Sequence, residues 1–261
     1  MSLSGRVRPG SDSDGGTIAP VDAVVLAAGR GVRLGELTRT TPKVLVEVNG
    51  RPLLDYHLDA LRAVGVRRVV LVVHHFAEQI HRHVDDGRPF ALRVESVHQP
   101  EPLGTGDAVR VAGPRVETDP FLLCYADVFL PNEPAVLRAM LADASPKITA
   151  AQVPDGGSYG RLLTREDRGE LFLAGLQEKD GRRTPALVNA GIYLLPKSIL
   201  PRVATIARST RGEYEFTDAI REFVATGGKL RVVAVSDWVD AGTAESLARA
   251  DVLARQKPSP G

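Results

Sequence analysis

The chain has 261 residues, of which 43% are hydrophobic, and its 33 basic and 32 acidic side chains leave a formal net charge of +1. This balance creates no global field that would attract nucleic acid or an anionic membrane, and the sequence lacks a run of the roughly 20 apolar residues that span a bilayer. We therefore expect a soluble, cytoplasmic protein with a sizeable core and with neither a nucleic-acid nor a membrane partner.

The composition of the chain changes after its first twenty residues. Residues 1–20 are rich in Gly, Ser and Asp, so they cannot bury enough apolar surface to offset the conformational entropy of ordering them. We predict a disordered leader there. The remainder, residues 21–257, is predicted to form a single domain.

The first predicted element is a short buried strand that ends in a glycine loop. Ala23–Leu26 is apolar and contains a β-branched pair, as is typical of a strand in a parallel sheet. Gly29 and Gly31 follow, and without side chains they let backbone N–H groups approach a phosphate chain. The same stretch carries four cations within fourteen residues: Arg30, Arg33, Arg39 and Lys43. The pattern predicts a polyphosphate-binding loop.

Other interpretations of this loop can be tested by spacing. A dinucleotide fingerprint needs a third glycine where this chain has Leu34, with Gly35 arriving one residue late, and the Walker sequence is absent. A tight strand-to-helix turn with solvated arginines is the remaining alternative.

The stretch from Leu26 to the Thr-Thr-Pro-Lys sequence ending at Lys43 resembles the signature of the sugar-1-phosphate nucleotidyltransferases, Gly-x-Gly-(Thr)-Arg-Leu followed by Pro-Lys. Glucose-1-phosphate thymidylyl- and uridylyltransferases belong to that family. Val32 stands where the family usually has Thr or Ser. The resemblance implies catalytic roles for Arg33 and Lys43. It also implies a nucleotide-binding stretch: Leu26, Ala27, Ala28, Gly29 and Gly31.

Strands and helices then alternate. An amphipathic helix begins near Leu53 and ends near Gly65, and it is followed by strand 66–73, helix 76–84, strand 91–97, strand 121–125, helix 133–144 and strand 148–153. Cys124, the only cysteine, lies in one of these apolar strands and is predicted to be a buried thiol rather than a reactive one. The alternation predicts an α/β fold with a doubly wound parallel sheet.

A polar loop follows strand 91–97, at the edge where open α/β sheets hold ligands. It contains Gln99, Gly104 and Thr105 before a helix predicted to begin at Asp107. Thr105 is also a candidate N-cap for that helix. The resemblance implies that Gln99, Gly104 and Thr105 contact the nucleobase.

Two distant aspartates are the predicted metal ligands. Asp127 directly follows strand 121–125, and Asp240 lies in a Trp-x-Asp-x-Gly-Thr sequence after a β-branched strand at 230–235. An aspartate at the end of a strand is commonly a cap or a turn former. The resemblance instead implies that both aspartates bind Mg²⁺, although Ala126 replaces the glycine that usually precedes the first.

The second half of the chain alternates like antiparallel strands at 159–163 and 171–177. Tyr159-Gly160, Gln177-Glu178-Lys179 and Asn189-Ala190-Gly191 match family elements in order, as does the Glu-x-Thr-Asp segment that ends at Asp218. The resemblance implies that Lys179 is catalytic and holds the sugar phosphate. It implies sugar contacts from four other residues: Tyr159, Gly160, Glu178 and Asn189.

Together these features predict a Rossmann-like, doubly wound and mostly parallel sheet of the nucleotide-diphospho-sugar transferase type, with an antiparallel sugar-binding portion. The implied activity condenses a nucleoside triphosphate, UTP or dTTP by preference, with a hexose 1-phosphate and uses Mg²⁺. Alternatives are a GTP- or CTP-dependent enzyme for a heptose, cyclitol or alcohol phosphate, and a non-catalytic nucleotide-sugar-binding regulatory subunit. A homo-oligomer is left open.

Overall fold

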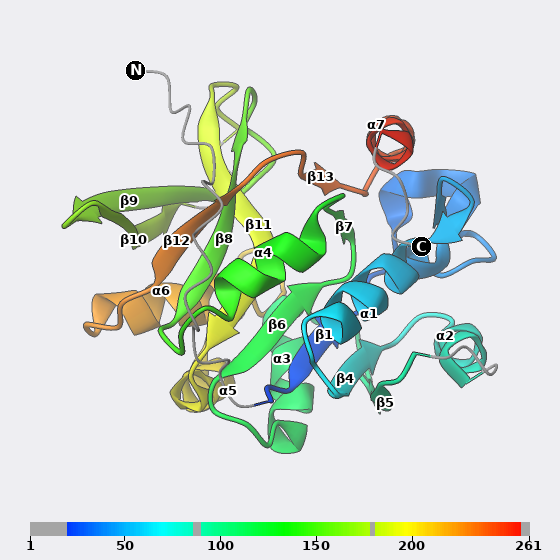
Figure 1. Ribbon diagram of the computed structural model, residues 1–261, viewed down its shortest axis with the longest axis horizontal. Coiled ribbons are helices and arrows are strands. Elements are labelled where there is room, and N and C mark those ends of the chain that lie inside the picture. The colour runs from blue at the N-terminus through cyan, green and yellow to red at the C-terminus, as the bar shows by residue number, and fades with distance from the viewer. Residues whose placement is uncertain (1–19, 86–89, 178–180, 257–261) are drawn as a thin grey trace.

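A nine-stranded sheet with the order β5-β4-β1-β6-β11-β8-β12-β10-β9 runs through the computed structural model, which describes residues 20–85, 90–177 and 181–256 (Figure 1). Its strands are β1 Ala23–Leu26, β4 Arg68–Val73, β5 Arg93–His98, β6 Phe121–Tyr125, β8 Lys147–Val153, β9 Arg161–Asp167, β10 Glu170–Gln177, β11 Ala186–Leu195 and β12 Arg231–Val235. Nearly all of the predicted leader, residues 1–19, lies outside the described part of the chain.

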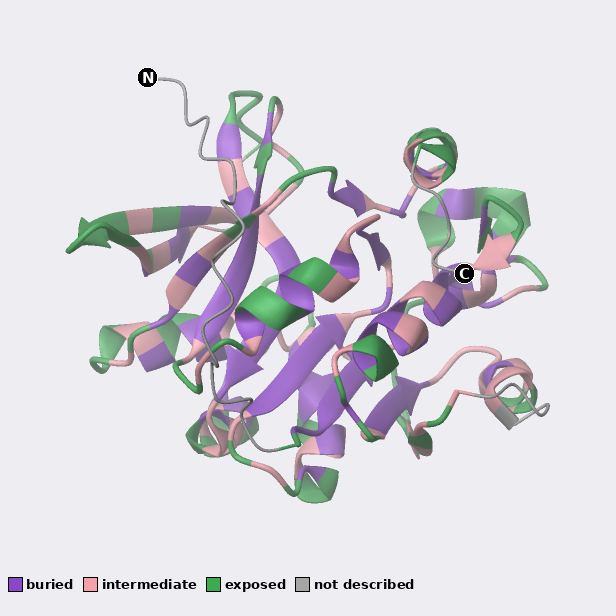
Figure 2. Cartoon of the chain, viewed as in Figure 1, coloured by how far each residue is buried: buried purple, intermediate pink, exposed green. Residues whose placement is uncertain are grey.

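Helices cover both faces of the sheet. They are α1 Leu53–Ala63, α2 Ala77–Asp85, α3 Thr105–Ala112, α4 Glu133–Met140, α5 Leu200–Thr205, α6 Phe216–Ala225 and α7 Ala244–Arg255. Leu58 of α1 and Leu137 of α4 pack with one face of the sheet, whereas Val109 of α3 and Ile220 of α6 pack with the other. Figure 2 shows the resulting pattern, with a buried sheet and exposed outer surfaces on the helices. The predicted doubly wound α/β fold is confirmed.

The sheet is mixed rather than wholly parallel. Strands β5, β4, β1 and β6 pair in parallel, but β11 from the second half of the chain lies between β6 and β8 and is antiparallel to both. Strand β12 returns parallel to β8, and the β9–β10 hairpin adds antiparallel strands at that edge. The insertion of β11 joins the two halves of the chain in one sheet.

Two small sheets complete the fold: β2 Glu47–Val48 with β3 Arg51–Pro52, and β7 Val128–Phe129 with β13 Val239–Asp240. The β7–β13 pair forms a third apolar cluster with Leu34 and with Leu247 of α7. This cluster ties the loop after β1 to the C-terminal helix. Among the described residues, no helix is both long and apolar enough to cross a membrane.

Cys124 is fully buried in β6. Burial raises the pKa of this thiol well above its ordinary value, and the negative charge of Glu133 raises it further. The prediction of a buried thiol is confirmed.

Candidate active site

Two adjoining cavities open where β1, β5 and β6 end. The larger has a volume of about 520 Å³ and the smaller about 210 Å³, and both are lined by Thr105, Tyr125 and Asp127. The carboxyl edge of a parallel sheet is where α/β folds bind ligands, and the larger volume lies in the range of small-molecule sites. The two cavities therefore form one candidate site with two compartments.

Most of the predicted site residues line one of the two cavities. In the larger cavity these are Leu26, Ala28, Gly29, Gly31, Lys43, Gln99, Gly104, Thr105 and Asp127. In the smaller they are Arg33, Thr105, Asp127, Tyr159, Gly160, Asn189 and Asp240. Ala27 lines neither of these cavities: its side chain is buried in the core, and its N–H donates to Val72 O at 2.8 Å. Glu178 and Lys179 lie outside the described residues.

The two glycines of the first loop have different tasks. Gly31 has a φ of 67°, and an added Cβ would lie 2.9 Å from Thr38 Cγ2, so only glycine fits the path of the chain there. Thr38 closes this turn by donating from Oγ1 to Gly31 O at 2.9 Å. At Gly29, by contrast, an added Cβ would meet no protein atom within 4 Å. Gly31 shapes the loop, and Gly29 leaves open space beside the larger cavity.

The four cations of this region do not act together. Arg30 and Lys43 line the larger cavity, and Arg33 lines the smaller. Arg39 lines neither of them and forms a 2.8 Å surface ion pair with Glu36. The prediction of a four-cation cradle is wrong for Arg39, because the turns of the 3-10 helix Val32–Thr38 direct it toward solvent.

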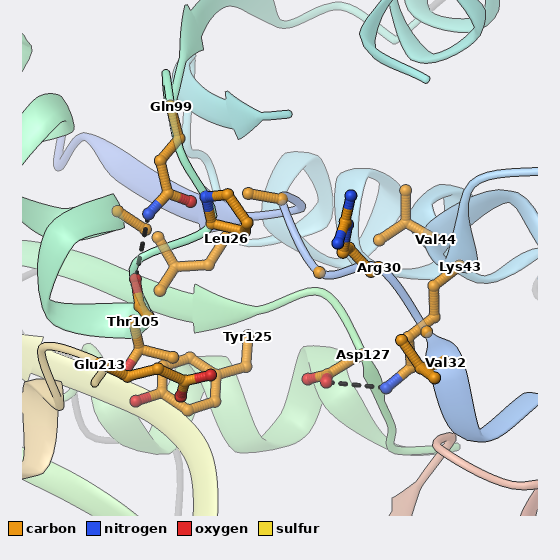
Figure 3. Close-up of a pocket in the computed structure, with 16 residues that line it drawn as sticks. Leu26, Arg30, Val32, Lys43, Val44, Gln99, Thr105, Tyr125, Asp127 and Glu213 are labelled. Atoms are coloured by element: carbon orange, nitrogen blue, oxygen red, sulfur yellow. Dashed lines mark hydrogen bonds and ion pairs between the residues drawn. The ribbon is translucent and has the colours of Figure 1, made fainter. Parts of the chain in front are cut away.

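The two predicted metal ligands, 113 positions apart in the numbering, meet at the β7–β13 pair. Asp127 directly precedes β7, Asp240 ends β13 opposite Val128, and Ala241 N donates to Asp127 O at 2.9 Å. Lys43 Nζ lies 2.8 Å from Asp127 Oδ2 and 3.9 Å from Asp240 Oδ1. Figure 3 shows Lys43 reaching Asp127 at the end of the larger cavity. One buried ammonium group therefore contacts both carboxylates.

A second cation, Arg33, contacts Asp240 from the smaller cavity. Arg33 Nη2 donates to Asp240 Oδ2 at 3.4 Å, and the Arg33 side chain is 61% exposed. It passes so close to Gly242 that an added Cβ there would lie 2.5 Å from the guanidinium. Gly242, two residues after Asp240, thus makes room for Arg33.

The surroundings of the two carboxylates move their pKa values in opposite directions. Burial would raise the pKa of Asp127, but the charge and hydrogen bond of Lys43 outweigh it and lower that pKa below its ordinary value. Burial and then repulsion from Asp127 raise the pKa of Asp240, although Lys43 and Arg33 act against this. Two carboxylates that repel each other across a cavity are suited to share a divalent cation.

This donor set fits a hard, partly hydrated metal ion. No group of three or more His, Cys, Asp or Glu side chains with metal-binding geometry occurs among residues 20–85, 90–177 and 181–256. Mg²⁺ is commonly held by one or two carboxylates together with waters and phosphate oxygens. Asp127 and Asp240 could hold such an ion, and an all-protein site such as zinc usually occupies is not needed.

The far end of the larger cavity is formed by the loop before α3. Gly104 has a φ of 99°, and an added Cβ would lie 2.6 Å from Tyr214 O. Thr105 is the first residue of the helix and not its N-cap, which is Gly104. Its Oγ1 instead accepts a hydrogen bond from Phe216 N at 3.0 Å. The cap prediction for Thr105 is wrong because a contact between distant segments uses its hydroxyl.

The smaller cavity has aromatic and amide walls. The ring of Tyr159 packs edge-on against Trp238 with 5.3 Å between centroids, and Trp238 Nε1 donates to Ala190 O at 3.1 Å. Asn189 donates from Nδ2 to Tyr193 Oη at 2.6 Å and accepts from Gly191 N at 3.0 Å. These contacts fix Tyr159 and Asn189 at the cavity wall.

Several residues that line the smaller cavity had no predicted role, among them Tyr125, Arg211 and Glu215. Arg211 lies four residues before Glu215, the first residue of the Glu-x-Thr-Asp segment, and pairs with it at 2.7 Å, so its closeness to that segment was the available signal. Tyr125 is the last residue of β6, and its position at the carboxyl end of a strand was the signal. Burial raises the pKa of Tyr125 to about 12, so its hydroxyl stays protonated near neutral pH.

Comparisons with known proteins identify the family of the chain. Residues 22–257 match the sequence profile of a family described as nucleotidyl transferase. Glucose-1-phosphate thymidylyltransferase from Streptomyces griseus is 33% identical over 241 residues, which are 91% of this chain and 67% of that protein. UTP–glucose-1-phosphate uridylyltransferase AglF from Haloferax volcanii is 31% identical over 235 residues, covering 88% of this chain and 95% of that protein.

A solved structure is similar over nearly the whole chain. HddC from Yersinia pseudotuberculosis, in complex with GMP-PN, superposes with a TM-score of 0.68 and 26% identity, covering 91% of this chain and 100% of that one. Several relatives are longer proteins, and the chain spans 64% and 47% of the length of two of them. The resemblance seen in the sequence is confirmed, and the chain belongs to the nucleotidyl transferase family.

Proposed function

We propose that this protein condenses a nucleoside triphosphate with a sugar 1-phosphate to give a nucleotide sugar and pyrophosphate. One observation carries the proposal: Lys43 contacts both Asp127 and Asp240 at the point where the two cavities meet. A charge cluster between two compartments is suited to a reaction that joins two phosphate-bearing substrates.

The chemistry needs charge neutralisation more than a general base. An oxygen of the sugar phosphate attacks the α-phosphorus of the triphosphate, a new P–O bond forms, and the bond to the β-phosphate breaks to release pyrophosphate. Because the second pKa of a phosphate monoester is about 6, the attacking oxygen is already ionised near neutral pH. The protein must hold two anions together and align them in line.

We assign the triphosphate to the larger cavity and the sugar phosphate to the smaller. The loop with Gly29 and Gly31 would hold the phosphates, and Gln99 with Gly104 and Thr105 would contact the base. Lys43 would neutralise charge at the α-phosphate. Asp127 and Asp240 would hold Mg²⁺, which supplies positive charge to both phosphates when it is bound.

Arg33 is assigned to charge that develops during the reaction. Its exposed side chain rests on Asp240 over a 3.4 Å contact, a weak surface pair that can separate when a ligand enters. The guanidinium would then stabilise the transition state and the departing pyrophosphate.

The sugar side is assigned to the smaller cavity. Tyr159, Gly160 and Asn189 line it and would contact sugar hydroxyls. The roles of Glu178 and Lys179, with Lys179 on the sugar phosphate, stay predictions from the family resemblance. Arg211, which also lines this cavity, is a further cation for the same phosphate.

A hexose 1-phosphate is the favoured acceptor, with UTP or dTTP as the favoured donors and the cytoplasm as the proposed location. Relatives with different nucleotides in their names match this chain, so a GTP- or CTP-dependent enzyme for a heptose, cyclitol or alcohol phosphate is the main alternative. A non-catalytic regulatory subunit is the second alternative.

The test is a matrix of five nucleoside triphosphates against a panel of sugar 1-phosphates with Mg²⁺, read as pyrophosphate release. We expect turnover with at least one hexose 1-phosphate, and loss of that turnover in Asp127→Asn. Nucleotide binding without pyrophosphate release in any combination would contradict an enzymatic role and would favour the regulatory alternative.

A further inference from the structure

We propose that Asp107 fixes the amide of Gln99 so that only its carbonyl oxygen is available to the nucleobase. A carbonyl oxygen accepts a hydrogen bond, so it favours bases that carry a ring N–H, namely uracil, thymine and guanine, over cytosine and adenine. The inference rests on the proposed function in one respect, namely that the larger cavity holds the nucleoside triphosphate.

The backbone of Gln99 is held on both sides at the end of β5. Its N–H donates to Val73 O at 2.8 Å, and its carbonyl oxygen lies 2.8 Å from His74 Nδ1. The residue is only 2% exposed, yet it lines the larger cavity. Gln99 therefore presents a small, fixed surface to a ligand.

Both amide hydrogens of Gln99 are used inside the protein. Nε2 donates to Asp107 Oδ2 at 2.8 Å and to Gly104 O at 3.1 Å. A carboxylate and a backbone carbonyl can only accept, so the reversed amide would set an oxygen against two acceptors. The orientation is thus dictated by the partners. Figure 3 shows the amide nitrogen of Gln99 turned toward the start of α3 and its oxygen turned the other way, toward Leu26.

Asp107 is itself held in place. It lies in the first turn of α3, is 3% exposed, and forms an ion pair through Oδ1 with Arg110, one turn later. The Arg110 guanidinium also lies over the ring of Tyr214, 5.2 Å from its centroid. Asp107 is absent from the described lining of the larger cavity, so it acts through Gln99 as a positioning residue.

A single hydrogen-bond acceptor distinguishes bases by whether the ring nitrogen that faces it carries a hydrogen. Uracil and thymine carry N3–H and guanine carries N1–H, each of which can donate to Gln99 Oε1. Cytosine N3 and adenine N1 would instead place a lone pair against it, and their amino groups could reach it only if the base shifted in its plane. Paired recognition of adenine by a glutamine amide uses both its N–H and its C=O. Asp107 removes that option here.

The decisive variant is Asp107→Asn. An asparagine at this position can donate to Gln99 Oε1, so the amide can turn and offer an N–H to the base. We expect the ratio of kcat/KM for CTP or ATP to that for UTP, dTTP or GTP to rise about tenfold or more, mainly through KM. The matched control is Glu101→Gln, which removes an equal charge from an exposed position in the same loop and should leave the ratio unchanged.

Binding of the five triphosphates by calorimetry, without a sugar phosphate, gives a second readout that needs no turnover. If Asp107→Asn does not fold, Arg110→Gln, which releases the carboxylate, should lower the selectivity in the same direction. A wild-type protein that binds CTP or ATP as tightly as UTP, dTTP and GTP would overturn the inference, as would a folded Asp107→Asn with unchanged ratios. Absence of binding by every nucleotide would instead overturn the proposed function.

Discussion

The two cavities of the site are built in different ways. The larger is lined mainly by two short segments of the chain, residues 28–32 in the loop after β1, and Gln99, Pro102, Gly104 and Thr105 in the segment after β5. The smaller draws single residues from segments spread along the chain, among them Arg33, Asn189 and Arg211. A local sequence pattern can therefore specify most of the first cavity, whereas the second exists only after distant segments have packed together.

The cluster of Lys43, Asp127 and Asp240 combines a residue from a local loop with residues from distant segments. Lys43 comes from the N-terminal loop, Asp127 follows a central strand, and Asp240 comes from the C-terminal region. The β7–β13 pair that aligns them has only two residues in each strand. Phe129 of β7 and Val239 of β13 are both buried in the third apolar cluster, so the position of the pair depends on that packing.

The largest expected effect is at the cluster itself. Asp127→Asn and Asp240→Asn should each lower kcat for pyrophosphate release by about 10²-fold or more, because each removes a charge that positions the reacting phosphates. Both variants should also need more Mg²⁺ for half-maximal rate. Thermal unfolding checks that they are folded. Near-normal kcat in either variant would show that the two halves do not share one metal-dependent centre.

The next prediction concerns the buried histidine that holds β7 in place. His57 is fully buried, with Nδ1 2.8 Å from Glu133 Oε1 and Nε2 2.9 Å from Val128 O in β7. Both neighbours accept, so the ring must carry two N–H groups. Substituting His57 by Leu leaves the Glu133 carboxyl buried without its partner, and we expect a loss of about 3 kcal/mol in the free energy of unfolding.

The same residue makes stability depend on pH. Burial alone would lower the pKa of His57, but the Glu133 carboxylate outweighs it and raises the pKa above the ordinary value. A raised folded-state pKa gives a stabilising contribution that is complete below about pH 6.5 and is lost as pH rises through the folded-state pKa. Urea unfolding from pH 6 upward should show this decline in wild type and a flatter profile in His57→Leu. Parallel profiles would contradict the assignment.

Substitutions in the two cavities should change the KM values of different substrates. Asn189→Ala removes an amide from the smaller cavity and should raise KM for the sugar phosphate about tenfold, with little change in KM for the nucleotide. Gln99→Ala in the larger cavity should do the reverse. Steady-state kinetics with each substrate varied in turn decides this, and equal effects on both KM values would argue against two compartments.

The smallest effects distinguish the two loop glycines. Gly31→Ala meets a positive φ and a 2.9 Å contact with Thr38, and should lower the free energy of unfolding by about 1–2 kcal/mol. Gly29→Ala has open space and should leave stability within about 0.5 kcal/mol of wild type while raising KM for the nucleotide. Denaturant unfolding and nucleotide titration compare the pair. A Gly31→Ala variant as stable as wild type would contradict the structural role of Gly31, and a Gly29→Ala variant with a normal KM for the nucleotide would contradict the binding role of Gly29.

Much of the fold could be predicted because its signals are local. Apolar runs such as Val69–Val73 and the helical spacing of Leu54, Leu58 and Leu61 identify strands and helices without reference to the rest of the chain. The glycine loop and Gln99 were likewise recognisable, since each follows a strand and so reaches the carboxyl edge of the sheet.

Tertiary structure alone decided which distant segments meet. The insertion of β11 between β6 and β8, the contact of Thr105 with Phe216 N, and the outward direction of Arg39 have no local signal. The spacing of side chains along a chain encodes which face is apolar, but strand order and the meeting of Asp127 with Asp240 result from packing among segments far apart in sequence. The sequence by itself determined the elements and the chemical character of the site, and long-range packing determined its geometry.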